Sequence, residues 1–386
     1  MKRGLLIVVI MGIMLLFAGV AMAVKGPCSD CHTMHYSQTP WPSDWQSTGG
    51  PFDFLLGGTC IGCHSGSSAN PVKTLSGGSK VPVVLFTDTC PSDQGPGVTL
   101  AGGNFCWVDD DVGSREDEKG HNVAGIVGVD SNLGYDPPGW DPSYTSGFTF
   151  GQVTGGDNAS WSEQLTCAGT FGCHGFHTPK GVGGSHHNNK GADPSTNSYG
   201  KVPATGTDNC GGYYRFLANI EGGEDGDWEY TANESDHNEY KGADITSGRN
   251  VEDPTGPPGD QTTISYLCAE CHGVFHSRIT DQDPYSTPYL RHPTDTVLPA
   301  SGEYQYYNPD NANVYSIEAP VARVTIPDSP SSTVTPGTDI VMCLSCHRAH
   351  GSPYNDILRW DYSQIIAGQG TEDEGCFVCH TQKNAD

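Results

Sequence analysis

The apolar residues of this chain form one long run near the start and only short runs afterwards. The long run covers residues 4–20, follows two basic residues and precedes Ala21-Met22-Ala23. This order of basic, apolar and small residues is typical of a secretory signal peptide. We therefore expect residues 1–23 to be a signal peptide and the mature chain to start at Val24, with an uncleaved anchor as the alternative. No later stretch approaches the roughly 18 apolar residues that span a bilayer.

Short patterns of hydrophobic and polar positions follow. Alternation at 81–86 and at 147–153 predicts two strands. Residues 328–338 are rich in Pro, Ser and Thr and predict a loop. Residues 355–366 place most of their apolar side chains on one face of a short helix. These elements are too few and too short to build an aliphatic core of the usual size.

Six cysteine-histidine motifs indicate another source of buried apolar surface. Five have the spacing Cys-x-x-Cys-His, which is the attachment signature of c-type haem. They are Cys28/Cys31/His32, Cys60/Cys63/His64, Cys268/Cys271/His272, Cys343/Cys346/His347 and Cys376/Cys379/His380. The remaining motif, Cys167/Cys173/His174, is the third in chain order and has five residues between its cysteines; the motifs are numbered below in chain order. In each motif two thiols attach the porphyrin and the adjacent imidazole binds the iron as the proximal ligand. The sequence thus predicts six haem c groups.

Composition agrees with a haem-filled protein. Hydrophobic residues make up only 35% of the 386 residues, beside 51 glycines and 27 prolines. Such a composition also fits disorder, but six covalent links to rigid macrocycles argue against it. We expect residues 24–386 to form a single haem-threaded domain, mostly irregular and loop-rich, with short helices and a few short strands wrapped around a chain of haems. The widest gaps between motifs predict loop inserts at about 65–160 and 188–262.

The charge is strongly one-sided. The formal net charge is −26, and without Lys2 and Arg3 it becomes −28. Nucleic acid and anionic lipid are therefore poor partners. Solubility of an exported protein explains this charge, and steering toward a basic redox partner or binding of cations are the alternatives. The acidic clusters match no complete calcium loop, so we interpret them as solvated loops.

Nine histidines remain for the sixth coordination position of each iron. They are His35, His121, His177, His186, His187, His237, His276, His292 and His350. Outside the expected signal peptide only Met34 and Met342 could serve instead, so the numbers favour bis-histidine ligation. His35, His177 and His350 lie three residues after a proximal histidine, and His276 lies four after one. On a helix such pairs point from one face. They cannot hold one iron between them, so we expect the second histidine to reach a neighbouring haem or to bond a propionate or carbonyl.

Several phrases resemble exported multihaem c-type cytochromes of metal-reducing bacteria, some of which polymerise into cytochrome nanowires. The most specific is the Cys-His-Thr-Met-His of residues 31–35; others are Lys-Gly-His-Asn at 119–122, Ser-His-His-Asn at 185–188 and Leu-Arg-His-Pro at 290–293. The resemblance implies distal ligands at His35, His121, His276, His292, His350 and one of His186 and His187. His177 and His237 fall outside that set, and we expect His237 at the surface. In the filament-forming relatives the second histidine of the opening phrase binds a haem of the adjoining subunit, which implies the same for His35.

Three cysteines lie outside the motifs, namely Cys90, Cys106 and Cys210. In an oxidising compartment the first two would close a short ring, and we predict a disulfide between them. Cys210 is then left to be buried or to pair between subunits. The stretched motif leaves two possibilities for its haem, either two thioethers or one at Cys173 with Cys167 free or disulfide-bonded. We favour two thioethers.

Together these features predict an exported electron carrier and not an enzyme. Surplus histidine leaves no open iron for a reductase, which is the weaker alternative. A head-to-tail homopolymer through His35, secreted to the cell surface or beyond, is the favoured assembly, and a monomeric periplasmic or outer-surface shuttle is its rival. Other redox proteins or an extracellular acceptor would be the partners.

Overall fold

The computed structural model describes twelve stretches of chain and four single residues. They are 27–32, 59–75, 77–112, 115–140, 160–175, 186, 200–201, 214, 216–217, 220–244, 260, 262–276, 292, 294–309, 312–367 and 374–381. The expected strand at 147–153 lies outside the described residues. Within them, no helix is long and apolar enough to cross a membrane.

Each regular cysteine-histidine motif is a single tight turn. The turns are η1 (Cys28–Asp30), α3 (Cys60–His64), α6 (Ile264–Ala269) followed by α7 (Gly273–His276), η8 (Cys343–Ser345) and η11 (Gly375–Val378). In four of them the carbonyl of the first cysteine accepts the N–H groups of both the second cysteine, at 3.2 Å, and the histidine, at 2.8–3.1 Å. This pair of bonds brings two thiols and one imidazole to the same side of one turn.

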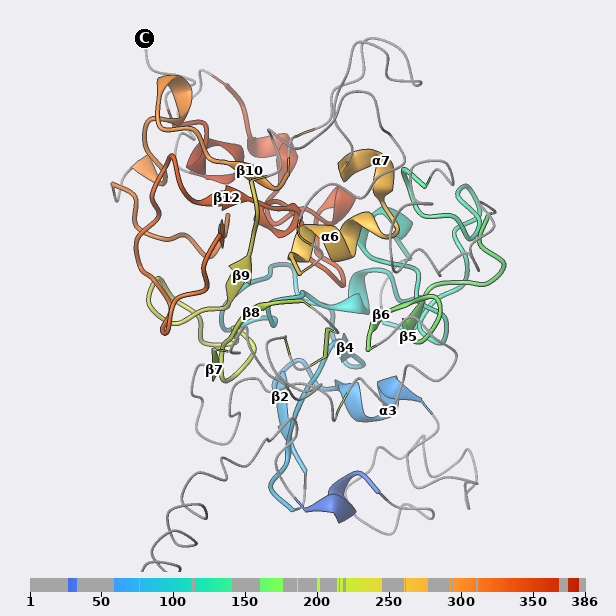
Figure 1. Cartoon of the computed structure of the whole chain (residues 1–386). Helices are drawn as coiled ribbons and strands as arrows, with labels where there is room; N and C mark the ends of the chain where they lie inside the picture. The colour runs from blue at the N-terminus through green and yellow to red at the C-terminus, as the bar shows by residue number, and fades with distance from the viewer. Residues whose placement is uncertain are drawn as a thin grey trace, which may run out of the picture.

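The largest sheet has six very short strands in the order β10-β12-β11-β9-β8-β7. These are β7 (Gly200–Lys201), β8 (Gly222–Glu224), β9 (Glu239–Lys241), β10 (Thr296–Val297), β11 (Ala322–Arg323) and β12 (Ile340–Val341). Ala322 pairs with Tyr240 on one side and Ile340 on the other. The three side chains are buried in one cluster, so the sheet joins segments far apart in sequence through a small apolar contact (Figure 1).

Smaller strand pairs lie near the second and third motifs. They are β1 (Ser65–Gly66) with β4 (Leu85–Phe86), β2 (Val72–Thr74) with β3 (Lys80–Pro82), and β5 (Thr166–Ala168) with β6 (Gly172–His174). The alternation at 81–86 therefore falls on β3 and β4, although residues between them belong to neither strand. Single 3₁₀ turns η2 (Phe105–Trp107), η3 (Asp117–Lys119) and η6 (Gly302–Tyr304) complete the connections.

The helix expected at 355–366 is wrong. The segment contains two separate 3₁₀ turns, η9 (Asn355–Ile357) and η10 (Tyr362–Gln364), with positive φ at Asp356 and Ile357. Apart from these two turns, its backbone bonds to the fifth motif and not along a continuous helix. Arg348 N–H donates to the Ile357 carbonyl at 2.9 Å, and Arg359 N–H donates to the Cys346 carbonyl at 2.9 Å. Pairing with the motif turn replaces the helical hydrogen bonds.

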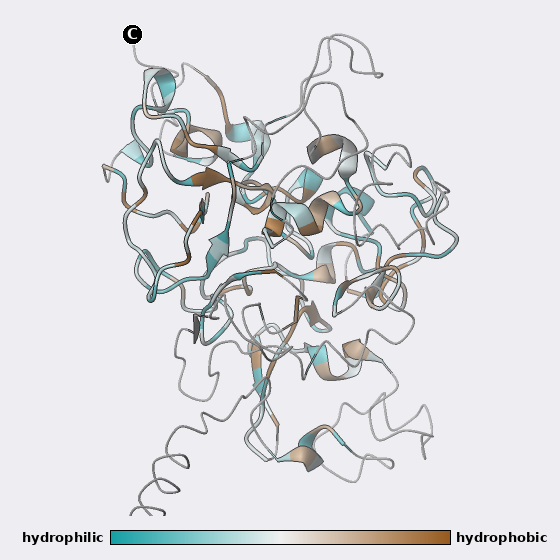
Figure 2. Ribbon diagram, in the orientation of Figure 1, coloured by the Kyte–Doolittle hydropathy of each residue, from teal (hydrophilic) through white to brown (hydrophobic). Residues whose placement is uncertain are grey.

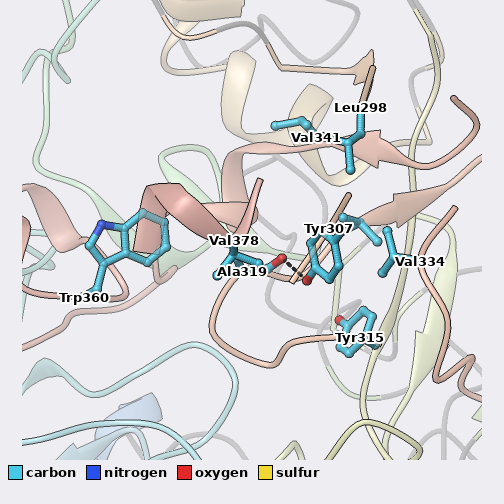
Figure 3. Packing of buried hydrophobic residues seen from close by; sticks show 9 residues of the cluster. Leu298, Tyr307, Tyr315, Ala319, Val334, Val341, Trp360 and Val378 are labelled. Atoms are coloured by element: carbon cyan, nitrogen blue, oxygen red, sulfur yellow. Dashed lines mark hydrogen bonds between the residues drawn. The ribbon is translucent and has the colours of Figure 1, made fainter. Parts of the chain in front are cut away.

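Apolar side chains gather in several small clusters. The largest surrounds Tyr307, whose hydroxyl donates to the Ala319 carbonyl at 2.7 Å, and includes Trp360 and Val378 (Figure 3). Motif cysteines of the fifth and sixth turns pack against this cluster. Figure 2 shows hydrophobic stretches dispersed along the chain between hydrophilic ones. The loop-rich fold with short helices and strands is confirmed, and the single haem-threaded domain remains a prediction.

The two cysteines that the sequence paired lie together. The Sγ atoms of Cys90 and Cys106 are 2.09 Å apart and the Cα atoms 5.4 Å apart. Both residues belong to a cluster with Phe86 and Trp107, which anchors η2 against β4. The bond closes the insert that follows the second motif.

Replacing both Cys90 and Cys106 with Ala should lower the free energy of unfolding by roughly 3 kcal/mol, because the open chain gains the entropy of the closed ring. Thermal unfolding followed by circular dichroism measures the loss. Cys210→Ala is the matched control and should leave stability unchanged. Non-reducing peptide mapping that links Cys90 to Cys210 would overturn the pairing.

Candidate haem sites

Five of the six proximal histidines have a described partner at Nδ1. Four of the five meet a backbone carbonyl, and the other, His380, meets a carboxylate. The contacts are His64 to Pro82 O at 2.9 Å, His174 to Phe216 O at 3.3 Å, His272 to Pro138 O at 2.7 Å, His347 to Asp356 O at 2.7 Å and His380 to Glu303 Oε1 at 3.1 Å. A carbonyl oxygen only accepts, so Nδ1 carries the proton there. The lone pair is then on Nε2, where an iron can bind it.

Burial favours the neutral form of four of these rings, His64, His174, His272 and His347. It lowers the pKa of His64 to about 4 and that of His272 to about 4, because the charged imidazolium loses hydration. The pKa of His174 is lowered for the same reason. A neutral imidazole with a free Nε2 is the form that coordinates a metal, so the environment favours ligands at neutral pH.

Four pairs of imidazoles face each other at nearly one spacing. The ring centroids are 6.1 Å apart for His64 and His186, 6.1 Å for His121 and His272, 6.2 Å for His174 and His350, and 6.2 Å for His292 and His380. With metal–nitrogen bonds of about 2.0–2.1 Å on both sides of one iron, the two centroids would lie roughly 6.3 Å apart. The residues present therefore fit one haem iron between each pair.

Each pair combines a proximal histidine with one that the sequence offered as a distal candidate. His350 lies opposite His174 and not opposite His347, its neighbour in the fifth motif. His186 is the member of the double histidine that faces His64. His35, His177 and His187 lie outside the described residues, as does the side chain of His276.

One backbone junction holds two of these distal candidates. It is made of residues 102–104, 119–121 and 349–352. Its hydrogen bonds run from His350 N to Gly102 O at 2.7 Å, Asn104 N to Gly351 O at 3.2 Å, Ser352 N to Lys119 O at 2.9 Å and His121 N to His350 O at 3.1 Å. His121 Nδ1 adds a bond to the Ala349 carbonyl at 2.8 Å. The imidazoles of His121 and His350 are thereby fixed relative to each other and to the fifth motif.

The junction depends on close backbone contact at two glycines. Gly103 has φ +79°, and a β-carbon there would collide with the Gly351 carbonyl oxygen. A β-carbon on Gly351 would collide with the carbonyl oxygen of Asn104. Only glycine allows the three backbone segments to approach one another this closely.

Motifs that are consecutive in sequence are neighbours in space. The thiol of Cys60 interacts with that of Cys167, which lowers the pKa of Cys60 to about 7. The thiols of Cys268 and Cys343 interact as well, and that contact with burial raises the pKa of Cys268. Burial raises the pKa of Cys63 to about 12, and the thiol of Cys31 adds to that rise. Burial likewise raises the pKa of Cys346 to about 12, with the thiol of Cys376 adding to it.

The third and fourth motifs are neighbours as well. Burial raises the pKa of Cys271, and the nearby thiol of Cys173 adds to that rise. Each of the five steps from the first motif to the sixth thus has a thiol–thiol contact or interaction. In Figure 1 the first described residues (blue) lie at the bottom of the view, and the last (orange to red) lie near the top. These thiols react when haem is attached, so adjacent haems would be attached side by side.

The stretched motif forms a wide loop that brings its two ends together as a parallel strand pair. β5 and β6 pair directly, Thr166 with Gly172 and Ala168 with His174, and the Thr166 N–H donates to the Phe171 carbonyl at 2.8 Å. A β-carbon on Gly172 would lie 2.5 Å from the backbone of Ala168. The extra residues are therefore taken up in this loop, and Cys167 and Cys173 lie near enough to interact electrostatically.

His237 is not at the surface, so that expectation is wrong. Its side chain is fully buried and stacks on Tyr315 with centroids 3.7 Å apart. Its Nε2 lies 3.4 Å from Glu239 Oε1, and Glu239 accepts a bond from Arg323 Nε at 2.9 Å. The Ser-Asp-His-Asn context suggests a polar loop, but long-range packing onto residues 315–323 buries the ring.

Sequence reasoning also missed the groups around the ligands. Glu303, which meets His380, lies 77 positions away in sequence and belongs to no motif. The glycines of the junction carry no chemical signature either, although an excess of glycine in the chain was visible. Only the folded arrangement shows what these residues contact.

Residues 336–385 match the family model for the doubled CXXCH motif, which covers the fifth and sixth motifs. None of the curated protein sequences matches the chain. The chain aligns with the Outer Membrane Cytochrome S filament from Geobacter sulfurreducens at 18% identity and a TM-score of 0.45, over 91% of this chain and 88% of that one. It aligns with the OmcS nanowires from Geobacter sulfurreducens at 18% identity and a TM-score of 0.42, over 94% of each chain. At this level of similarity, the function has to come from the residues of this chain.

Gly172→Ala should reduce the number of covalently attached haems by one, because the loop opens and the two cysteines separate. Intact mass of the mature protein gives the count, which should be six for the native chain. Thr170→Ala in the same loop is the control and should retain six. A native count of five would refute the haem at the stretched motif.

Proposed function

We propose that this multihaem c-type cytochrome is an exported electron carrier that holds six haems, each with two histidine ligands. The observation that carries the proposal is the spacing of the four imidazole pairs, 6.1–6.2 Å, which matches two ligands on one iron. Electron transfer by a c-type cytochrome also fits the doubled CXXCH match at 336–385.

The haem iron supplies a centre that accepts and releases one electron. The protein's part is to present Nε2 from both sides and to exclude other ligands. Carbonyls at Nδ1 orient the proximal rings, and burial keeps the rings uncharged. Two histidines leave no coordination position for a substrate, which favours conduction over catalysis.

Four pairs account for the motifs that end at His64, His174, His272 and His380. For the motifs that end at His32 and His347, we propose distal ligands from among His35, His187 and His276. The consecutive thiol contacts support a continuous series of haems through the whole chain.

We further propose that the exported chain polymerises head to tail, with His35 donated to a haem of the next subunit. His35 lies at one end of the motif series, and a heterologous contact that does not close yields a filament. The two solved structures with which the chain aligns are filaments of another cytochrome. A monomeric periplasmic or outer-surface shuttle is the second candidate, favoured by the strong negative charge of −26.

The proposed location is outside the cytoplasmic membrane, at the cell surface or beyond it. The expected signal peptide at 1–23 and the pairing of Cys90 with Cys106 both support an oxidising compartment. Basic redox proteins or an extracellular acceptor are the proposed partners.

His350→Ala should convert one haem per chain from low-spin to high-spin, because one iron loses its second imidazole. Electron paramagnetic resonance of the ferric protein measures the high-spin fraction. His237→Gln, which alters a buried histidine outside the pairs, should leave every haem low-spin. A His350→Ala protein whose haems all stay low-spin would show that His350 is not a ligand.

His35→Ala should abolish filaments and leave one haem per subunit high-spin. Negative-stain microscopy and the same spectroscopy give the two readouts. If the variant still polymerises with all haems low-spin, His35 does not bridge subunits. If microscopy shows the native protein as monomers and spectroscopy shows all its haems low-spin, the shuttle is correct.

A further inference from the structure

The last two haem sites stand in opposite electrostatic surroundings. The guanidinium of Arg359 bonds to the backbone of the motif that ends at His347, and the guanidinium of Arg348, the next residue along the chain, lies near enough to Arg359 to be repelled by it. A carboxylate, Glu303, meets the imidazole of the motif that ends at His380. Consecutive motifs are neighbours through Cys346 and Cys376, so the contrast lies within one step of the series.

Arg359 is buried, with only 4% of its surface exposed, and bonds to the backbone of the fifth motif. Its Nε donates to the Leu344 carbonyl at 2.6 Å and to the His347 carbonyl at 3.2 Å. Its Nη1 donates to the Ile317 carbonyl at 3.1 Å, while Nη2 is buried with no hydrogen-bond partner among the described residues. The positive charge is therefore held by neutral groups.

Arg348, which follows His347 directly in the chain, is equally buried. Its Nε donates to Gln94 Oε1 at 3.2 Å, and its Nη1 donates to the Ala101 carbonyl at 2.8 Å. Within the described part of the chain neither arginine forms an ion pair with a carboxylate. Glu229 acts on Arg348 and Glu318 on Arg359 only through longer-range electrostatics. Two buried positive charges without a directly paired carboxylate are costly, which indicates a role beyond packing.

The sixth motif has the opposite arrangement. Glu303 Oε1 lies 3.1 Å from His380 Nδ1, and both side chains are about one-quarter exposed. The other described proximal rings meet uncharged carbonyls. A carboxylate at Nδ1 increases the basicity of the imidazole that binds the metal.

We propose that Arg348 and Arg359 raise the reduction potential of the haem at Cys343–His347, while Glu303 lowers that of the haem at Cys376–His380. This inference rests on the proposed bis-histidine haems and concerns how the protein sets their potentials. The three residues tune the sites without binding the irons.

The sign follows from the charge of each oxidation state. A ferric haem core carries one more positive charge than a ferrous one. Nearby arginines therefore disfavour the ferric state, and a carboxylate on the ligand favours it. One electron that leaves the sixth haem oxidises that iron and reduces the fifth. The electron is thus held preferentially at the fifth site.

Potentiometric titration of the complete haem-loaded protein, followed by its visible absorption, tests the proposal. Glu303→Gln keeps an acceptor at Nδ1 without the charge, and Arg359→Gln removes the positive charge at the fifth motif. Arg359→Lys keeps that charge and is the matched control. Each neutral substitution should change the electron-sharing equilibrium between the two sites by about tenfold, or 59 mV for a one-electron couple.

Glu303→Gln should move the lowest midpoint potential upward. Arg359→Gln should move the midpoint potential of a different haem, one of higher potential, downward. Arg359→Lys should leave every midpoint potential unchanged. Unchanged midpoints in Glu303→Gln, or shifts of the opposite sign, would overturn the proposal even if Arg359→Gln fails to fold. Haem count and low-spin resonance are measured on the same samples. If the native protein itself lacked the six haems or their low-spin resonance, the result would instead contradict the proposed ligation.

Discussion

The arrangement depends on one close contact between three backbone segments, residues 102–104, 119–121 and 349–352. The contact exists because Gly103 and Gly351 have no side chain to keep the segments apart. It fixes His121 opposite His272 and His350 opposite His174, and it continues directly from the fifth motif. The positions of three proposed haems are therefore set by a few main-chain hydrogen bonds, and no large apolar core is needed to hold them together.

This dependence explains why so little regular structure suffices. Four of the motifs are turns closed on the carbonyl of their first cysteine, and the largest sheet has strands of two or three residues. Apolar clusters are small, and the motif cysteines pack on them. In the haem-loaded protein the macrocycles would supply the remaining buried surface, so loss of one haem should be felt at its neighbours through the shared segments.

The sequence predicted the chemistry better than the geometry. Spacing of cysteine and histidine identified the motifs and the supply of distal imidazoles, because haem attachment leaves a local pattern. The same pattern could not show that His350 faces His174, since that distance depends on contacts between residues more than 170 positions apart. The helix expected at 355–366 failed because its backbone pairs with Cys346 and Arg348. His237 looked like a loop residue and is buried by a distant segment. Periodicity and motif spacing are local, whereas these outcomes are tertiary.

The central claim is that distal imidazoles cross between motifs, so that one segment serves several irons. The most direct test is a near-atomic cryo-EM structure of the native, haem-loaded protein, in which each iron and its two ligands are seen. The account predicts His350 on the iron of His174 and His121 on the iron of His272. An iron held by both His347 and His350, or a haem at His272 without His121, would contradict it.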